Sequence, residues 1–164
     1  MLAQNFAVEI MFSSESLKPG ITGMRICSLP FLFAISLALI GIISSTTEFF
    51  AFYNPKDKIA DFAYYVIHKL LEAHPDADMI YSDEDTLLSS GLRTNPVFKP
   101  DFSPDTIVSY NYTGLFCIYR RSLFSESDFT STPAKENEAA LFVYDIALKA
   151  FEKTKKICYN KNVL

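Results

Sequence analysis

The order of apolar and polar positions predicts a strand and then a helix in the middle of this 164-residue chain. The phenylalanine-rich run from Glu48 to Tyr53 predicts a short buried strand, which ends in the Asn-Pro turn of residues 54–57. Apolar residues then recur at helical spacing over residues 62–71. We therefore expect a helix that Asp61 caps and that ends before Pro75.

A second strand is expected over residues 78–82, and three carboxylates follow it directly: Asp83, Glu84 and Asp85. In open α/β sheets ligands bind beyond the carboxyl ends of the strands, so these acids are candidates for a binding site. The alternative is a solvated turn, in which the acids only satisfy nearby backbone N–H groups. Residues 86–105 contain three prolines and predict a long, ordered loop in extended conformations.

The C-terminal part predicts a strand, a long helix and a final strand. A helical turn precedes a third strand around residues 115–119, and residues 125–138 are expected to form a polar surface loop. Residues 139–156 have an amphipathic helical pattern, with lysines near the C-terminal end as the helix dipole favours. Its expected inward-facing members are Leu141, Ile146, Leu148 and Phe151. Residues 157–164 close the chain as a strand, which gives a mixed α/β order without an internal repeat.

Residues 26–47 form an apolar segment without a charged residue, long enough as a helix to span a bilayer at about 1.5 Å per residue. Lys18 and Arg25 precede it and Glu48 follows it, an orientation that would place the C-terminal bulk across the membrane from the cytoplasm. The segment lies too far from Met1 for a signal peptide. The other interpretation, a helix in the core, is favoured for its second half, so the chain is expected to be cytoplasmic or membrane-associated.

Composition narrows the class of protein. Hydrophobic residues make up 49% and aromatic residues 15% of the chain, so a folded domain is expected. The net charge of −4 is spread without a basic stripe, which argues against a nucleic-acid partner. Cys27, Cys117 and Cys158 lie far apart, so neither a disulfide framework nor a zinc site is expected.

Three blocks of the sequence resemble a known family: "EFFAFYNPKD" at residues 48–57, "EAHPDADMIYSDED" at 72–85, and "RTNPVFKPDFSPDTIVSYNYTGLFCIYRRSL" at 93–123. They are similar to the family 2 glycosyltransferases of polysaccharide and O-antigen synthesis, and the resemblance extends over residues 37–164. It implies a GT-A fold, a mixed sheet flanked by helices that binds a nucleotide-diphosphate sugar at strand ends.

The resemblance also implies that the nucleotide-binding half is incomplete. The family's first strand and its uridine-contacting segment have no identifiable counterpart in residues 1–20. The organisation expected from these comparisons is a divergent lead over residues 1–25, the apolar segment over 26–47, and a glycosyltransferase-like domain over 48–164.

The metal-binding Asp-x-Asp motif of the family would fall on Asn54 and Lys56, which leaves Asp57 as the neighbouring carboxylate. Such enzymes use Mn²⁺ or Mg²⁺ to neutralise the leaving diphosphate, and these cations prefer carboxylate ligands. A lysine ammonium repels a cation at that place, although it could contact a phosphate itself. The metal site is therefore expected to be damaged.

The proton-accepting residue of the family would fall on Val143, which cannot accept a proton. The neighbouring Asp145 matches the family pattern and is expected to orient groups near the acceptor. Asp83, Asp85 and Asn54 are expected to line the substrate site.

Two hypotheses about function lead. The first is a partial or impaired transferase that acts on a nucleotide-diphosphate sugar and a glycan acceptor. The second is a non-catalytic GT-A scaffold that serves as a binding module. A third is a small membrane-anchored protein.

Overall fold

The computed structural model describes residues 7–11, 42, 47–53, 57–129 and 139–164. The predictions for most of residues 1–47 therefore lie outside the described residues, as do those for Asn54 and Lys56. Within the described ranges no helix is long and apolar enough to cross a membrane. Ile42, at the end of the apolar segment, is fully buried in the main core.

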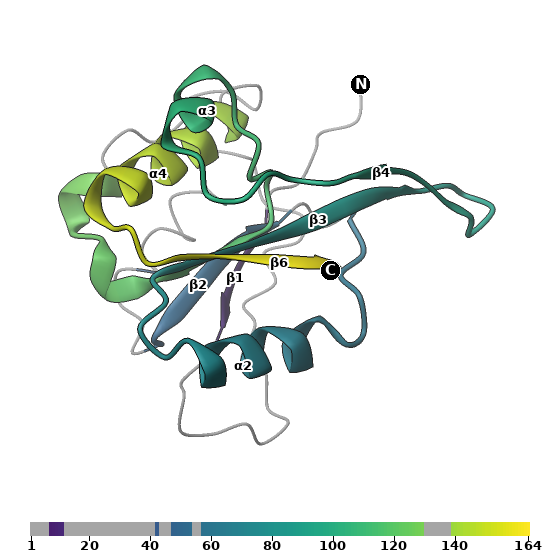
Figure 1. The fold of residues 1–164 in the computed structure, drawn as a ribbon, viewed down its shortest axis with the longest axis horizontal. Helices are drawn as coiled ribbons and strands as arrows, with labels where there is room; N and C mark the ends of the chain where they lie inside the picture. Colours follow the sequence, from purple (N-terminus) through teal and green to yellow (C-terminus); the bar gives the residue numbers. More distant parts are fainter. Residues whose placement is uncertain (1–6, 12–41, 43–46, 54–56, 130–138) are drawn as a thin grey trace.

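The described residues form a mixed α/β fold around a six-stranded sheet, which confirms the predicted fold class (Figure 1). The strand order is β1-β2-β5-β3-β4, and β6 also pairs with β3. Only the β3–β6 pair is parallel. The strands are β1 (Ala7–Met11), β2 (Phe49–Tyr53), β3 (Met79–Leu87), β4 (Arg93–Val97), β5 (Cys117–Arg120) and β6 (Ile157–Val163).

Helices cover both faces of the sheet. In Figure 1, α2 lies below the sheet, and α3 and α4 lie on the opposite side. The bounds are α2 (Ala63–Ala73), α3 (Pro104–Ser109) and α4 (Ala139–Lys153), with 3-10 turns η1 (Arg121–Leu123) and η2 (Glu126–Phe129) before α4. The sheet is therefore the middle layer of three.

The alternation of side chains along β2 explains how one strand serves two cores. Phe49 and Ala51 belong to the smaller cluster that includes Ile67 of α2. Phe50 and Phe52 point to the other face, because successive strand residues alternate. There, Phe52 contacts Phe142 of α4 with ring centroids 5.8 Å apart. A strand buried on both faces has no polar positions, which is why the run reads as continuously apolar.

Arg120, at the end of β5, joins three segments at the edge of the sheet. Its guanidinium donates to the carbonyl of Pro75 at 2.7 Å and to that of Ala77 at 2.8 Å. It also pairs with Glu48, which precedes β2, and with Asp78 at 3.2 Å. The planar guanidinium group of arginine carries several N–H donors, so this one side chain can reach all of these acceptors, which no other side chain could do.

Replacing Arg120 by Ala should lower the free energy of unfolding by about 2 to 4 kcal/mol, because several part-buried acceptors lose their donor. Arg120→Lys should be nearly as harmful, since one ammonium cannot reach all of these acceptors. Urea unfolding followed by circular dichroism measures the loss. Arg93→Ala is the control, because Arg93 is half exposed and should cost less than about 1 kcal/mol. Equal losses in the two alanine variants would contradict the structural role of Arg120.

Three predictions from the sequence need correction. First, residues 86–105 are not a loop, because β3 continues to Leu87 and pairs with β4 in an antiparallel hairpin, and α3 begins at Pro104. Pro96 is tolerated in β4 because the pairing shifts register there, and Asn95 takes a φ of 49°. The sequence pattern missed this strand because its polar residues and proline resemble a loop.

Second, Asp61 does not cap α2: Phe62 occupies the N-cap position, without a side-chain cap hydrogen bond. Third, Leu141 does not face the core, because its side chain is 64% exposed. Of the other expected members, Ile146 and Phe151 are buried and Leu148 packs against the main core. The buried stripe of α4 also includes Phe142, Val143, Ala147 and Ala150.

Candidate functional site

The acidic segment of β3 contains a buried carboxylate. Asp83 is only 2% exposed, and its Oδ1 accepts the backbone N–H of Lys99 at 2.8 Å and the Tyr159 hydroxyl at 2.6 Å. Lys99 follows β4, and Tyr159 lies on β6, which runs parallel to β3. A buried carboxylate is costly unless donors satisfy it, so both segments are fixed against β3 by this one group.

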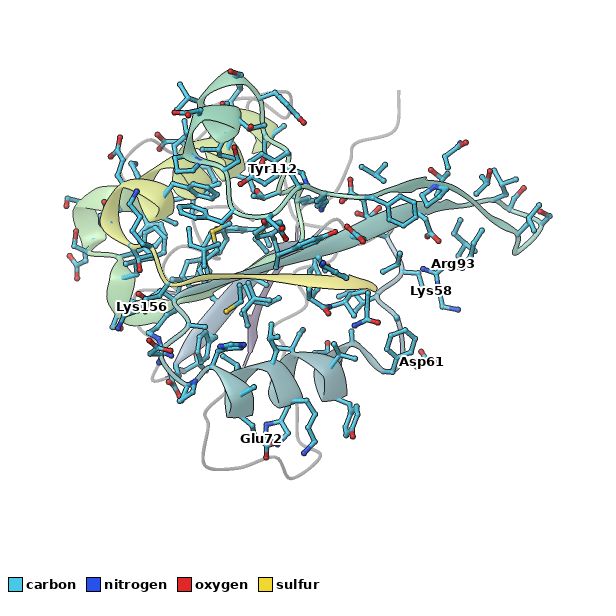
Figure 2. All side chains as sticks on the ribbon, in the orientation of Figure 1. Lys58, Asp61, Glu72, Arg93, Tyr112 and Lys156 are labelled. Carbon is cyan, nitrogen blue, oxygen red and sulfur yellow. The ribbon has the colours of Figure 1, made fainter. Side chains whose placement is uncertain are left out.

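The next residue, Glu84, pairs with the side chain of Lys99. The Lys99 ammonium lies 3.0 Å from Glu84 Oε2 and donates to the Thr113 carbonyl at 2.7 Å. The lysine side chain is 2% exposed, whereas that of Glu84 is 48% exposed. We call Asp83, Glu84, Lys99 and Thr113 the polar cluster. It joins β3 to the chain on both sides of α3. Tyr112, which precedes Thr113 in the chain, is labelled in Figure 2.

Asp85 lies on the opposite side of the strand from Glu84, since side chains alternate. It accepts a hydrogen bond from Arg93 Nε of β4 at 2.6 Å. Because the arginine side chain is 49% exposed, this pair contributes at most about 1 kcal/mol. The structure thus gives the three acids different surroundings: Asp83 is buried, Glu84 pairs with a buried lysine, and Asp85 pairs with an exposed arginine.

Two tyrosines extend the network of Asp83 into the core. Tyr81 stacks on Tyr159 with centroids 5.1 Å apart and donates its hydroxyl proton to the Pro100 carbonyl at 2.7 Å. Burial raises the pKa of Tyr159 to about 12, and the adjacent Asp83 carboxylate adds to this effect. Burial also raises the pKa of Tyr81, with a further contribution from the neighbouring Tyr112.

Stability should therefore fall at alkaline pH. Since the folded state holds the Tyr159 proton more tightly than the unfolded state does, the stabilisation is complete below about pH 10 and is lost toward pH 12. Urea midpoints at several pH values in this range should fall more gently in Tyr159→Phe than in the wild type. Tyr65→Phe, which removes an exposed phenol, is the control and should keep the wild-type slope. A wild-type midpoint that stays constant over this range would contradict the prediction.

Position 114, where the backbone lies against the side chains of the polar cluster, requires a glycine. Its φ is +80°, and a Cβ there would lie 2.6 Å from both Glu84 Oε2 and Lys99 Nζ. Gly91, in the β3–β4 turn, has a φ of +82° but nothing within 4 Å of a Cβ. The two glycines are thus matched in backbone conformation and differ in what surrounds them.

Gly91→Ala should destabilise the protein by about 1 to 2 kcal/mol, the cost of a left-handed conformation for a residue with Cβ. Gly114→Ala should cost about 3 kcal/mol or more, because it also separates Glu84 from the buried Lys99 ammonium. Chemical denaturation of both variants gives the difference. Indistinguishable losses would mean that the close approach at Gly114 has no energetic consequence.

The positions expected to hold a metal ion do not suit one. Two of the three residues, Asn54 and Lys56, lie outside the described residues, and their side chains supply one neutral amide and one cation. The third, Asp57, has an exposed side chain. In the described part of the chain, no group of three or more His, Cys, Asp or Glu residues could hold a metal ion. A single carboxylate beside an ammonium is a poor ligand set for Mn²⁺ or Mg²⁺.

The position expected to hold the catalytic base is part of the core. Val143 is 1% exposed and belongs to the main hydrophobic cluster. An aspartate at this place would bury an unpaired carboxylate at a cost of several kcal/mol, so Val143 contributes to stability. Asp145 lies near the surface of the same helix, where its Oδ2 is 2.7 Å from Lys149 Nζ. Its orienting role and the ligand-binding roles of Asp83 and Asp85 remain predictions.

Sequence reasoning missed the partners of the acids. Lys99, Thr113 and Tyr159 belong to segments that are separated along the chain, and no periodicity connects them. One signal was present in the sequence, because Lys99 lies between an aromatic residue and a proline inside the "FKPDFSPD" block of the resemblance. Phe98 and Pro100 are exposed, however, so the burial of Lys99 comes from its contacts with distant residues and could not be read from these neighbours.

Part of the chain is similar to a protein of glycan synthesis. It is 31% identical to the O-antigen biosynthesis protein RfbC of Myxococcus xanthus over 86 residues, which are 52% of this chain and 7% of that protein. It is 34% identical to the uncharacterized protein y4gI of Sinorhizobium fredii over 61 residues, 37% of this chain and again 7% of that protein. No family model matches. The chain thus spans only about 7% of the length of these two curated relatives, and the similarity covers only part of the chain itself.

Proposed function

We propose that this chain is a glycosyltransferase-like scaffold that binds a nucleotide-diphosphate sugar and whose capacity to transfer the sugar to a glycan acceptor is impaired. The observation that carries the proposal is the 86-residue similarity to an O-antigen biosynthesis protein. A mixed sheet with helices on both faces is the fold that the resemblance implies, and the acids of β3 lie in one of its blocks.

Impairment follows from the chemistry of three side chains. Transfer from a sugar diphosphate needs a positive charge at the leaving group and a base at the acceptor hydroxyl. Asn54 and Lys56 replace the carboxylates that would hold a cation, although the lysine supplies a positive charge of its own. Val143 supplies no base and is packed in the core. Binding without fast turnover is the behaviour expected of such a site.

The buried position of Val143 also favours a second candidate, a binding module without catalysis. Val143 is integrated into the packing around Ile146 and Phe142, so this position offers no group that could accept a proton. The two candidates differ in turnover and agree in binding a nucleotide-diphosphate sugar.

Calorimetric titration with uridine-diphosphate sugars, with and without Mn²⁺, tests the proposal. We expect weak binding that Mn²⁺ leaves unchanged in the wild type. The double variant Asn54→Asp/Lys56→Asp should bind Mn²⁺ and bind the sugar nucleotide roughly tenfold more tightly when Mn²⁺ is present, because two hard ligands join Asp57.

Lys58→Asp is the matched control, since it introduces an aspartate at an exposed position just outside the motif. It should show no dependence on Mn²⁺. Heat signals that are flat for both the wild type and the double variant, with every sugar nucleotide tried, would refute the proposal. Release of free nucleotide diphosphate by the wild type distinguishes the impaired transferase from the binding module.

A further inference from the structure

β3 and β4 form an arm that extends beyond the rest of the sheet, as Figure 1 shows. β3 pairs with β5 only as far as Tyr81 and with β6 only as far as Asp83, and beyond that point it pairs with β4. We call residues 84–98 the arm. Among the described residues the arm is therefore a two-stranded ribbon, and such ribbons are at best marginally stable in water on their own.

The arm has no core of its own. None of residues 84–98 is buried. Its cross-strand ion pair, Asp85 with Arg93, involves an arginine side chain that is 49% exposed, and such pairs stabilise little. The ladder between its strands is also irregular, because the register shifts and Pro96 has no N–H to donate. Exposed pairing without buried apolar contacts is typical of segments that open locally.

The two residues that flank the arm are, by contrast, buried and oppositely charged. Asp83 is 2% exposed and Lys99 is 6% exposed. The backbone N–H of Lys99 donates to Asp83 Oδ1 at 2.8 Å, so the two ends of the arm are bonded directly to each other. We call this pair the neck of the arm.

Further hydrogen bonds fix the neck to the body of the protein. The Tyr159 hydroxyl of β6 donates to Asp83 at 2.6 Å, and the Lys99 ammonium donates to the Thr113 carbonyl at 2.7 Å. Opening the neck would leave a buried charge without its partners, which is far more costly than losing exposed pairs. The neck should therefore stay closed when the arm opens.

The neck lies at the carboxyl end of the parallel pair β3 and β6. Asp83 pairs there with Val163, the last residue of β6. Ligands of α/β sheets bind beyond the carboxyl ends of strands. The arm thus continues β3 past the edge of the sheet at which such ligands bind.

We propose that the arm is a conformational unit of its own, whose strands separate and re-pair while the neck and the pairing of β3 with β6 stay closed. The exposed pairing of the arm gives it this freedom. The two buried charges of the neck confine the opening to residues 84–98.

Hydrogen–deuterium exchange of the full chain at pH 7, followed by mass spectrometry, tests this. After correction for intrinsic rates, the backbone amides of residues 86–95 should exchange at least about 100-fold faster than those of residues 79–82, because the arm opens without the sheet. Equal protection of the two segments would overturn the proposal, since arm and sheet would then open together.

Two variants of the neck test what confines the opening. Lys99→Met removes the ammonium but keeps the backbone N–H that Asp83 accepts. It should speed exchange in residues 79–83 and in β6 at least about tenfold and change that of the arm less than about threefold, because the arm is already open to exchange. Glu84→Gln removes the charge that faces the same ammonium and should act in the same direction, more weakly.

Arg93→Met is the matched control, since it removes a cation from the exposed ion pair within the arm. It should leave exchange in residues 79–83 and in β6 at the wild-type rates. Circular dichroism checks the fold of each variant, and Glu84→Gln keeps the test decisive if Lys99→Met does not fold. The neck assignment fails if neither neck variant speeds exchange in β3 and β6, or if Arg93→Met speeds it equally.

Discussion

The burial of the Asp83 carboxylate is the constraint on which the centre of this structure depends. An ionised group that is 2% exposed has to be met by donors, and here both donors come from distant segments, Lys99 after β4 and Tyr159 on β6. Lys99 is itself buried and in turn requires the Thr113 carbonyl and Glu84. One charge in the strand thus supports the parallel pairing of β3 with β6, the return of the chain after β4, and, through Lys99, the approach to β5.

Two of the positions at which the resemblance implies chemistry, Asp83 and Val143, hold the fold together in this structure. Arg120 and Asp83 tie segments together through several hydrogen bonds each. Val143, by contrast, adds apolar area to the core in a place where a catalytic carboxylate would be a burden. An apolar residue at this position therefore favours stability over any polar chemistry there. This is the usual trade between a polar active site and a well-packed core.

The polar cluster also holds the base of the β3–β4 hairpin. Glu84 of β3 pairs there with the buried ammonium of Lys99, which follows β4. Gly114 allows this pair to sit against the chain. The place at which the hairpin leaves the sheet therefore depends on the same buried lysine.

The sequence by itself determined the elements with strong periodicity: the Phe-rich strand β2, the helices α2 and α4, the start of β3 and the mixed α/β class. These depend on local patterns of 2.0 or 3.6 residues, which are visible without the fold. Patterns failed for β4, whose proline and polar residues form a strand only because β3 lies beside them. They also failed for the cap of α2 and for the exposed Leu141 of α4. The partners of Asp83 and the surroundings of Gly114 were decided by tertiary structure alone, because burial and hydrogen bonding between distant segments leave no periodic trace in the chain.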